Sequence, residues 1–307
     1  MGGNGYIGSH LVEELLRLGR SVRVCSRRLP GLLPAAVLND PLLQCVQGDL
    51  LDPSFCYTVL DGCSAVVHCI GPVIPSASNA DPILDWHQHV EPTMVLLGVM
   101  REASHCRFLF VSSGGTVYGP NCPIPTPEDA ICKPISAYGI HKLSIENFLY
   151  LEHCLYGLDY VIARIANPYG GRQRRQALQG APTVFLSKVL TGDCIDLWGA
   201  GEIKRDFIHI SDVTDALVRM IDYQGTSHVF NIGSSISFSI KHLIERIEAL
   251  SGRTALIRAL PPRPFDVPVN QLDIDLARIE LDWSPKLDLD EGIKQCLQEL
   301  SRADSGQ

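Results

Sequence analysis

The chain opens on a glycine-rich segment that constrains its fold more than any other part of the sequence. Residues 2–8 read G-G-N-G-Y-I-G, so glycines recur at the spacing G-x-x-G-x-x-G, and an amphipathic helical pattern follows directly. Glycine permits a tight turn and a close approach of the backbone to a bound group. The N–H groups at a helix start attract anions. We therefore predict a dinucleotide-binding turn, with a pyrophosphate at the helix start.

Such a turn should follow a buried strand, yet only Met1 precedes Gly2. In a doubly wound sheet this first strand is central. Its loss would leave buried backbone groups unpaired, at about 1–3 kcal/mol each. We therefore expect that the first strand is truncated here and that the natural chain starts upstream. The alternative is a form that folds poorly, and a stop codon directly before Met1 would favour it.

Short apolar runs alternate with helical patterns in the first part of the sequence. The expected strands are residues 21–25, 44–47, 65–69, 108–112 and 160–164, and the expected helices are 9–18, 83–102 and 137–155. The strands are apolar on both faces, as in parallel sheets covered by helices on two sides. The pattern predicts an α/β fold with a doubly wound parallel sheet, the Rossmann arrangement.

After about Asn167, proline and glycine become frequent and helical patterns dominate. We expect helices at residues 183–190, 211–222, 239–250 and 290–300, a strand at 228–232, and a proline-rich loop at 260–268. This predicts a dinucleotide-binding domain, residues 1–166, and a smaller, mostly helical substrate-binding lobe, residues 167–307. Within that lobe, residues near 205–235 would return to the first sheet.

Charge and composition exclude several classes of function. The chain has 26 Lys and Arg against 34 Asp and Glu, a net charge of −8. Binding to nucleic acid is therefore not expected, because it needs clustered positive charge. There is no apolar run long enough for a membrane span and no signal peptide pattern. The 11 cysteines contain no C-x-x-C pair, so we expect no metal site and a cytoplasmic protein with reduced thiols.

The end of the second expected strand bears on the cofactor. An acidic residue there binds the ribose 2′-hydroxyl of NAD, whereas an arginine accommodates the 2′-phosphate of NADP. This chain has Ser26, Arg27 and Arg28 at that point. The residues predict NAD(P) with a lean toward NADP. The alternative is that both arginines are solvated loop residues.

A Tyr-x-x-x-Lys pattern lies at the start of the helix expected at 137–155. The spacing of four places Tyr138 and Lys142 on one helix face. A nearby ammonium lowers the pKa of a phenol from its usual value of about 10, so the phenol can exchange a proton near neutrality. This is the acid–base group needed when a hydride leaves or joins a sugar carbon. By itself the pattern would also fit a surface pair.

Four further segments accompany this pair in a fixed order. They read S-S-G-G-T-V-Y-G at 112–119, R-I-A-N-P-Y-G at 164–170, R-D-F-I-H-I-S-D at 205–212 and R-P-F-D-V-P at 263–268. With the glycine turn, they resemble the extended short-chain dehydrogenase/reductase family of NAD-dependent epimerases and dehydratases. Within that family they resemble the UDP-glucose 4-epimerase-like branch. The resemblance spans nearly the whole chain, from residue 2 to about residue 300.

The resemblance implies roles for matching residues. The catalytic set would be Tyr138, Lys142 and Ser113. The cofactor would contact Gly2, Gly5, Tyr6, Ile7, Gly8, Ser26, Arg27, Asp49, Leu50 and Lys142. The nucleotide-sugar would contact Ser113, Tyr138, Asn167, Arg205, Arg263 and Asp266.

In the implied substrate site, Arg205 and Arg263 would clamp the diphosphate, because a guanidinium is planar and permanently charged. Asp266 would bind the nucleoside ribose. Two plainer readings remain open: Asn167 as a turn residue before proline, and Arg205 as the partner of Asp206 in a surface ion pair.

Two positions depart from the family pattern. Gly114 stands where the family usually has a Ser or Thr that hydrogen-bonds the reacting sugar hydroxyl; of the neighbours Ser113 and Thr116, we expect Ser113 to replace it. His89 stands at the position of a usual Asn. We expect His89 to pack at the cofactor cleft, with a catalytic role as the alternative.

The resemblance implies a nucleotide-sugar epimerase that works through a transient keto-sugar. Related dehydratases carry Asp-Glu where this chain has Gly115 and Thr116, which argues against loss of water. One alternative is an NADPH-dependent nucleotide-sugar reductase, favoured by Ser26 and Arg27. Another is a non-catalytic NAD(P)-binding relative, favoured by Gly114. Members of the family commonly dimerise through the helices expected here at 83–102 and 137–155, so a homodimer is expected.

Overall fold

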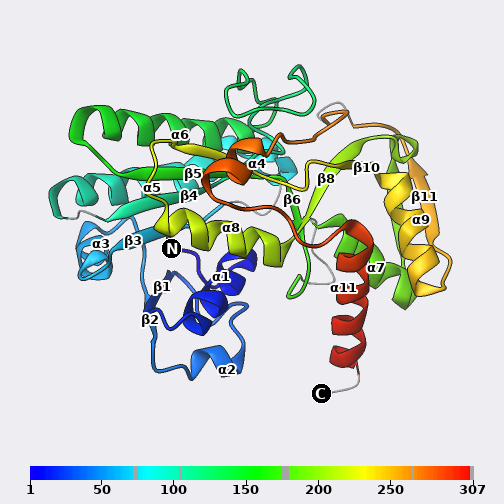
Figure 1. Cartoon of the computed structure of the whole chain (residues 1–307), viewed down its shortest axis with the longest axis horizontal. Coiled ribbons are helices and arrows are strands. Elements are labelled where there is room, and N and C mark those ends of the chain that lie inside the picture. Colours follow the sequence, from blue (N-terminus) through cyan, green and yellow to red (C-terminus); the bar gives the residue numbers. More distant parts are fainter. Residues whose placement is uncertain (72–74, 104–105, 174–179, 264–265, 305–307) are drawn as a thin grey trace. The chain divides into compact units, whose positions relative to one another are not determined.

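The computed structural model describes residues 1–71, 75–103, 106–173, 180–263 and 266–304 (Figure 1). These residues form two compact units, between which the chain passes several times. Unit 1 comprises Met1–Ser113, Ser136–Arg164 and Thr214–Phe230. Unit 2 comprises Gly114–Ile135, Ile165–Val213 and the segment from Asn231 onward.

A four-stranded sheet forms the centre of unit 1. Its strands follow the order β3-β4-β5-β9, and they are β3 (Ala65–His68), β4 (Arg107–Ser113), β5 (Tyr160–Ile165) and β9 (Val229–Ile232). Strands β3 and β4 run parallel, and β4 and β5 are buried along most of their length. All four strands were predicted, each to within one residue at either end.

A second, two-stranded parallel sheet in unit 1 pairs β1 (Val22–Ser26) with β2 (Leu43–Gln47). The expectation that every strand is apolar on both faces is wrong for β2, which is largely exposed. Among the described residues, β2 pairs with β1 alone, so much of its surface stays in contact with solvent.

The first two residues connect the two sheets of unit 1. The Met1 ammonium donates to the Val67 carbonyl at 2.8 Å, and the Cys69 N–H donates to the Met1 carbonyl at 3.0 Å. On the other side, the Gly2 N–H donates to the Cys25 carbonyl at 3.0 Å. The main chain of residues 1–2 therefore lies between β1 and β3, at the place expected for the first strand.

The helices that lie wholly within unit 1 are α1 (Tyr6–Arg17), α2 (Ala35–Leu38), α3 (Pro53–Leu60), α4 (Pro75–Ala80), α5 (Pro82–Ala103) and α6 (Ala137–Tyr156). The three long helices, α1, α5 and α6, follow the predicted apolar patterns closely. Helix α6 begins where the Ser136 hydroxyl accepts the Gly139 N–H at 3.2 Å, and it ends at Gly157, whose φ is +72°. Helices α5 and α6 lie side by side (Figure 1). The short helices α2, α3 and α4 were not predicted.

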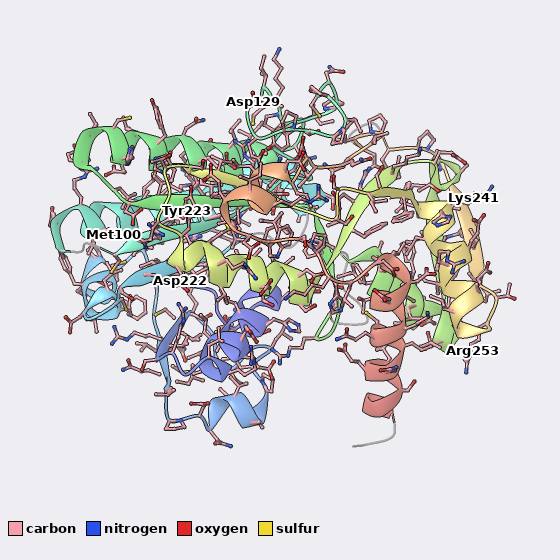
Figure 2. All side chains as sticks on the ribbon, in the orientation of Figure 1. Met100, Asp129, Asp222, Tyr223, Lys241 and Arg253 are labelled. Carbon is pink, nitrogen blue, oxygen red and sulfur yellow. The ribbon has the colours of Figure 1, made fainter. Side chains whose placement is uncertain are left out.

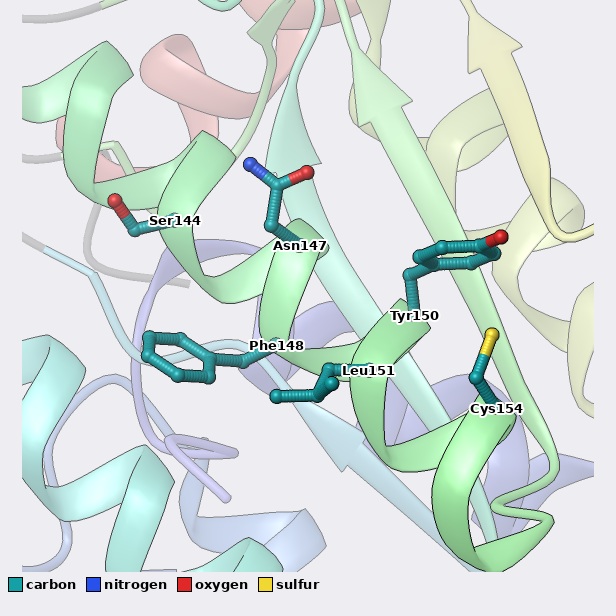
Figure 3. A pocket seen from close by; sticks show the side chains of 6 residues that line it. All are labelled: Ser144, Asn147, Phe148, Tyr150, Leu151 and Cys154. Atoms are coloured by element: carbon teal, nitrogen blue, oxygen red, sulfur yellow. The ribbon is translucent and has the colours of Figure 1, made fainter.

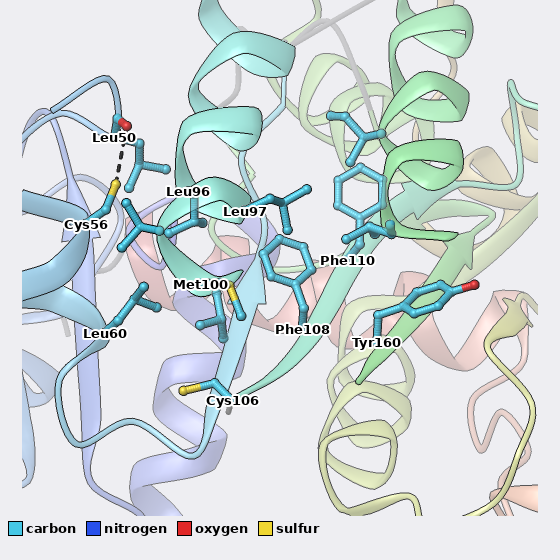
Figure 4. Close-up of a cluster of buried hydrophobic side chains, with 14 of the residues drawn as sticks. Leu50, Cys56, Leu60, Leu96, Leu97, Met100, Cys106, Phe108, Phe110 and Tyr160 are labelled. Carbon is cyan, nitrogen blue, oxygen red and sulfur yellow. Dashed lines mark hydrogen bonds between the residues drawn. The ribbon is translucent and has the colours of Figure 1, made fainter. Parts of the chain in front are cut away.

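An apolar core fills the space between the central sheet of unit 1 and its helices. Figure 4 shows Phe108 and Phe110 of β4 beside Leu97 and Met100 of α5, all of them almost completely buried. Removing a side chain of this size from such a position costs about 3–5 kcal/mol. This core fixes the ends of β3 and β4, from which the site described below is built.

Unit 2 contains more strands than the sequence predicted. It contributes β6 (Asn167–Tyr169), β7 (Cys194–Trp198), β8 (Lys204–His209), β10 (Ser237–Ser239) and β11 (Leu256–Leu260). These form a three-stranded sheet in the order β10-β8-β6 and a parallel pair of β11 and β7. Strands β6 and β10 span three residues each and β11 is mostly exposed, so no apolar run or clear alternation marked them.

The helices expected after Asn167 are present: α7 (Ala181–Thr191), α8 (Ile210–Asp222), α9 (Ile240–Ser251) and α11 (Leu289–Asp304). A short helix, α10 (Asp275–Glu280), was not predicted. Helices α7, α9 and α11 pack together in unit 2. Figure 2 shows Lys241 near the start of α9 and Arg253 just beyond its end. The proline-rich loop at 260–268 follows β11, and two of its residues, 264 and 265, lie outside the described residues.

Among the helices in the described part of the chain, none has the length and apolar character needed to span a membrane. All eleven cysteines are free thiols; four of them are buried, which are Cys25, Cys56, Cys106 and Cys296.

Candidate active site

The predicted glycine turn of unit 1 is folded tightly against the start of α1. Gly2 has a φ of +70°, and a Cβ atom on Gly8 would lie 2.3 Å from the Gly2 carbonyl oxygen. No side chain fits at Gly8, because real Cβ atoms never approach another atom so closely. Gly5 is the N-cap of α1, so Tyr6, Ile7 and Gly8 form its first turn. The backbone is open to close approach there, and a pyrophosphate fits this cradle.

The ends of β1 and β2 complete the predicted cofactor group. Ser26 is the last residue of β1, and its hydroxyl accepts the Arg28 N–H at 3.4 Å. Arg27 is exposed. After β2, the Asp49 carboxylate accepts the Leu51 N–H at 3.1 Å, and Leu50 is buried. The Gly2–Cys25 hydrogen bond places the end of β1 next to the glycine turn.

The three predicted catalytic residues belong to unit 1 and come from β4 and α6. Ser113, at the end of β4, forms a hydrogen bond with the Tyr138 hydroxyl. The Lys142 ammonium donates to the carbonyls of Val111 at 2.8 Å and Ile70 at 3.2 Å. It also lies 4.7 Å from the centre of the Phe110 ring. Since Ile70 follows β3 and Val111 belongs to β4, Lys142 is fixed where these two strands end.

One electrostatic expectation for this group is wrong. The sequence predicted that Lys142 lowers the pKa of Tyr138, but burial raises the pKa of Tyr138 to about 12. The Ser113 hydrogen bond acts in the opposite direction, and the Asp85 charge raises the pKa further. Burial also lowers the pKa of Lys142 to about 8. Desolvation dominates because Lys142 is buried and bonds to main-chain carbonyls, and because Tyr138 is half-buried beside it.

His89 was expected to pack at a cofactor cleft. The structure gives it a specific partner within α5: its Nδ1 lies 2.7 Å from a carboxylate oxygen of Asp85. The second oxygen of Asp85 lies 2.6 Å from Nδ1 of His141, on α6. Neither Asp85 nor His141 was predicted as a site residue from the sequence. The spacing of four between residues 85 and 89 on one helix was the only available signal.

The predicted substrate-binding residues lie in unit 2, apart from Ser113 and Tyr138. Arg263 donates to both carboxylate oxygens of Asp266, at 2.9 and 3.0 Å. Arg205 Nη2 lies 3.7 Å from the same carboxylate, and its Nη1 donates to the Val267 carbonyl at 2.6 Å. The Arg263 guanidinium also lies 5.2 Å from the centre of the Trp198 ring. Two guanidinium groups and one carboxylate leave a net positive group, suited to a phosphate.

The suggested ion pair between Arg205 and Asp206 is absent from the described residues. The Asp206 carboxylate is completely buried and accepts hydrogen bonds from the N–H groups of Ser234 and Leu272. Burial raises its pKa to about 6. Neighbouring residues of a strand point to opposite faces, so Arg205 and Asp206 of β8 have different partners.

Asn167 is held by its side chain and is more than a turn residue. Its Nδ2 donates to the Asp206 carbonyl at 3.1 Å and to Asn270 Oδ1 at 3.2 Å. Asn270 in turn donates to the Gly114 carbonyl at 3.0 Å. Asn270 was not predicted, because no motif marks it. Thr116, the other candidate for the missing hydroxyl, has a buried Oγ1 without a hydrogen-bond partner among the described residues.

The chain is similar in sequence to proteins of one family. The sequence profile of the NAD dependent epimerase/dehydratase family matches residues 1–233. UDP-glucose 4-epimerase of Mycolicibacterium smegmatis is 31% identical over 302 residues, which cover 97% of this chain and 96% of that protein. dTDP-4-dehydro-6-deoxyglucose reductase of Escherichia coli is 34% identical over 236 residues, 76% of this chain and 74% of that protein.

Two solved structures share the fold of the whole chain. UDP-glucose 4-epimerase of Thermotoga maritima, solved with UDP-glucose, has a TM-score of 0.91 at 31% identity and covers 98% of this chain and 97% of that one. UDP-glucose 4-epimerase of Thermus thermophilus, solved with NAD, has a TM-score of 0.89 at 26% identity and covers 98% of each chain. These matches confirm the predicted α/β fold of Rossmann type.

Proposed function

Because the chain belongs to the NAD dependent epimerase/dehydratase family, we propose that it epimerises the sugar of a nucleotide-sugar, with a nicotinamide cofactor that stays bound. The observation that carries the proposal is the half-buried Tyr138, whose hydroxyl is hydrogen-bonded by Ser113 and which lies one helical turn from Lys142. A phenol in this setting is an acid–base group for a sugar hydroxyl.

The residues of unit 1 fit a dinucleotide. The glycine turn would hold the pyrophosphate against the start of α1, since a Cβ on Gly8 would fill that space. Lys142 would hold the nicotinamide ribose, and Ser26, Arg27 and Asp49 would contact the adenosine half. The chemistry that a bound nicotinamide would supply is reversible hydride transfer: a hydride would leave the sugar carbon and later return to its opposite face. Family members in solved structures bind NAD.

In the proposed reaction, the phenolate form of Tyr138 would remove the proton of the sugar hydroxyl as that carbon loses its hydride. Because burial raises the pKa of Tyr138 to about 12, this form is the minor one near neutral pH. The product of this half-reaction is a keto-sugar. The keto-sugar then rotates so that its opposite face receives the hydride. Tyr138 returns the proton to the new alkoxide, so neither protons nor electrons are consumed. Ser113 would hydrogen-bond the reacting hydroxyl and keep Tyr138 oriented. Arg205, Arg263, Asn167 and Asp266 of unit 2 would bind the nucleoside diphosphate portion.

A second candidate is an NADPH-dependent nucleotide-sugar reductase. Two observations favour it: the similarity to the Escherichia coli reductase, and the sequence Ser26-Arg27 without an acid at the end of β1. Dehydration is disfavoured, because Gly115 and Thr116 provide no acid for eliminating water. A non-catalytic NAD(P)-binding relative is disfavoured by the intact Tyr138–Lys142 pair.

The deciding experiment offers the purified protein a panel of UDP-sugars and other nucleotide-sugars without added reductant and follows the products by NMR. The proposal expects interconversion of two epimers without net consumption of NADPH. If turnover consumes one NADPH for each sugar converted, the epimerase proposal is wrong and the protein is a reductase. Tyr138→Phe is the control: turnover should fall by about 100- to 10,000-fold while the cofactor still binds.

We further propose a cytoplasmic homodimer. Its contact surface would be the outer face of α5 and α6, which exposes Ile83, Ile140, Tyr150, Leu151 and Leu155. A shallow groove of about 470 Å³ on α6 belongs to this surface. Figure 3 shows the residues that line it, which are Ser144, Asn147, Phe148, Tyr150, Leu151 and Cys154. Apolar side chains gathered on one exposed face mark an interaction site.

A further inference from the structure

One buried carboxylate joins α5 to the first turns of α6. The Asp85 side chain is only 5% exposed, and each of its oxygens faces an imidazole: Oδ1 lies 2.7 Å from His89 Nδ1 and Oδ2 lies 2.6 Å from His141 Nδ1. His89 Nδ1 also lies 2.9 Å from the main-chain carbonyl of Asp85. Asp85, His89 and His141 are called the Asp85 cluster below.

The partners fix which ring nitrogens carry hydrogen. A carboxylate and a carbonyl can only accept, so Nδ1 of His89 must donate, and so must Nδ1 of His141 when Asp85 is ionised. In the neutral rings, Nε2 then carries the lone pair. An imidazole held in this way by a carboxylate is a stronger base and is fixed in orientation. Burial acts against this and lowers the pKa of His89.

The cluster lies next to the catalytic pair in unit 1. His141 immediately precedes Lys142 on α6, and the Trp86 ring meets the His141 ring edge-on at 5.7 Å between centroids. The Asp85 charge acts on both members of the pair and raises the pKa of Tyr138 and of Lys142. Helix α4, the third helix packed here, carries no titratable side chain.

On the strand side, the titratable neighbours are Cys69, whose thiol pKa is raised by burial, and His68 of β3. His68 is completely buried between Phe108 and Phe110, and its Nε2 lies 3.1 Å from Thr93 Oγ1. Thr93 gives its own proton to the His89 carbonyl at 2.6 Å, so His68 Nε2 donates to Thr93. Burial and the Lys142 charge hold the pKa of His68 well below its usual value. His68 therefore stays neutral and does not compensate Asp85.

We propose that Asp85 is a positioning residue for the proposed reaction: shared between His89 and His141, it anchors the first turns of α6 and sets the pH range in which Tyr138 and Lys142 exchange protons. This inference rests on the proposed function. Nothing in the sequence motifs assigns a role to Asp85 or His141, and their contact joins residues that are 56 positions apart.

The direction in which the pH profile moves follows from the negative charge of Asp85. A negative charge near Tyr138 disfavours the phenolate, and near Lys142 it favours the ammonium. Loss of the Asp85 charge therefore moves both limbs of a bell-shaped pH profile to lower pH. Protonation of His89 neutralises the cluster and has the same effect in part. Loss of an imidazole leaves the Asp85 charge uncompensated at acidic pH, and the acid limb then moves to higher pH.

The test compares pH profiles of kcat/KM for the wild type, Asp85→Asn and His141→Gln. The matched control is Glu91→Gln, which removes an exposed carboxylate of the same helix that pairs with exposed His87 at 2.7 Å. We expect Asp85→Asn to move both limbs down by at least about half a pH unit. His141→Gln should move the acid limb up, and Glu91→Gln should leave the profile in place. A profile of Asp85→Asn that overlays the wild type would overturn the proposal.

A second readout does not depend on turnover. Proton NMR titration of the histidine rings should show His89 titrating at lower pH in Asp85→Asn than in the wild type, because the carboxylate that raises its pKa is gone. The variant His89→Gln assigns the resonance. If the wild type turns over no nucleotide-sugar, the proposed function fails. An unchanged titration of His89 would refute the cluster in either case.

Discussion

Arg164 of β5 and Glu146 of α6 form a two-pronged ion pair inside the core of unit 1, with Arg164 Nη2 and Nε at 2.7 and 3.1 Å from Glu146 Oε2. The two side chains are only 8% and 4% exposed. The Ser112 hydroxyl of β4 also donates to Glu146. The pair thus ties the helix that carries Tyr138 and Lys142 to the two central strands, and the Glu146 charge raises the pKa of Lys142.

Removing one member of this ion pair should destabilise the protein strongly. Arg164→Met leaves the Glu146 carboxylate buried without its cation, which should cost about 3–5 kcal/mol in the free energy of unfolding. Urea unfolding measures the loss. The double variant Arg164→Met/Glu146→Leu removes both charges and should regain part of it. A single variant as stable as the wild type would contradict a paired core.

Ser113, rather than Thr116, should supply the hydroxyl that Gly114 lacks. Ser113→Ala removes the hydrogen bond that lowers the pKa of Tyr138, so turnover should fall about 10- to 100-fold. The acid limb of the pH profile should also move to higher pH. Thr116→Val is the matched control and should leave both unchanged, since Thr116 Oγ1 has no hydrogen-bond partner among the described residues. If Ser113→Ala and Thr116→Val lose the same amount of turnover, Ser113 is not the residue that supplies the hydroxyl.

His68 should make the protein less stable below neutral pH. Its pKa in the folded state is held well below the usual value of 6.5, so the unfolded chain takes up a proton that the folded chain refuses. Stability therefore falls as the pH drops below about 6.5, by up to about 1.4 kcal/mol per pH unit from this group. His68→Phe should reduce the slope of unfolding free energy against pH between pH 7 and 5. If the free energy of unfolding changes with pH equally in the wild type and in His68→Phe, His68 takes up its proton in the folded state as it does in the unfolded chain.

Arg27 should decide between the two nicotinamide cofactors. Since Arg27 is exposed and directly follows Ser26 at the end of β1, its guanidinium can pair with a 2′-phosphate. Arg27→Ala should weaken NADP binding about tenfold or more and leave NAD binding nearly unchanged. Ser26→Asp should shift preference toward NAD. Fluorescence titration of each cofactor measures both effects, and equal loss of affinity for NAD and NADP in Arg27→Ala would speak against a phosphate contact.

The outer face of α5 and α6 should hold two copies together. Leu151→Glu places a charge in the groove of Figure 3 and should convert dimers into monomers. Sedimentation analysis at several protein concentrations measures this. Ile279→Glu, a change at another exposed apolar residue in unit 2, serves as the control and should leave the mass unchanged. A wild type that sediments as a monomer would refute the proposed dimer.

The sequence by itself determined the strand–helix order and the glycine turn, because these depend on local spacing. The spacing of four residues was enough to place Tyr138 and Lys142 on one face of α6. A continuous apolar run was enough to predict strand β4. The same spacing and order carried the family resemblance. Strands β6 and β10 escaped prediction, because three residues are too few for a periodic signal.

Only the tertiary structure decided which distant residues meet and how deeply they are buried. Asp85 reaches His141 across 56 positions, and Arg205 lies by Asp266 rather than Asp206. Burial reversed the expected direction of the Tyr138 pKa. The free energy of a charge depends on the solvent and partners around it, and both are set by packing between elements, which no local pattern contains.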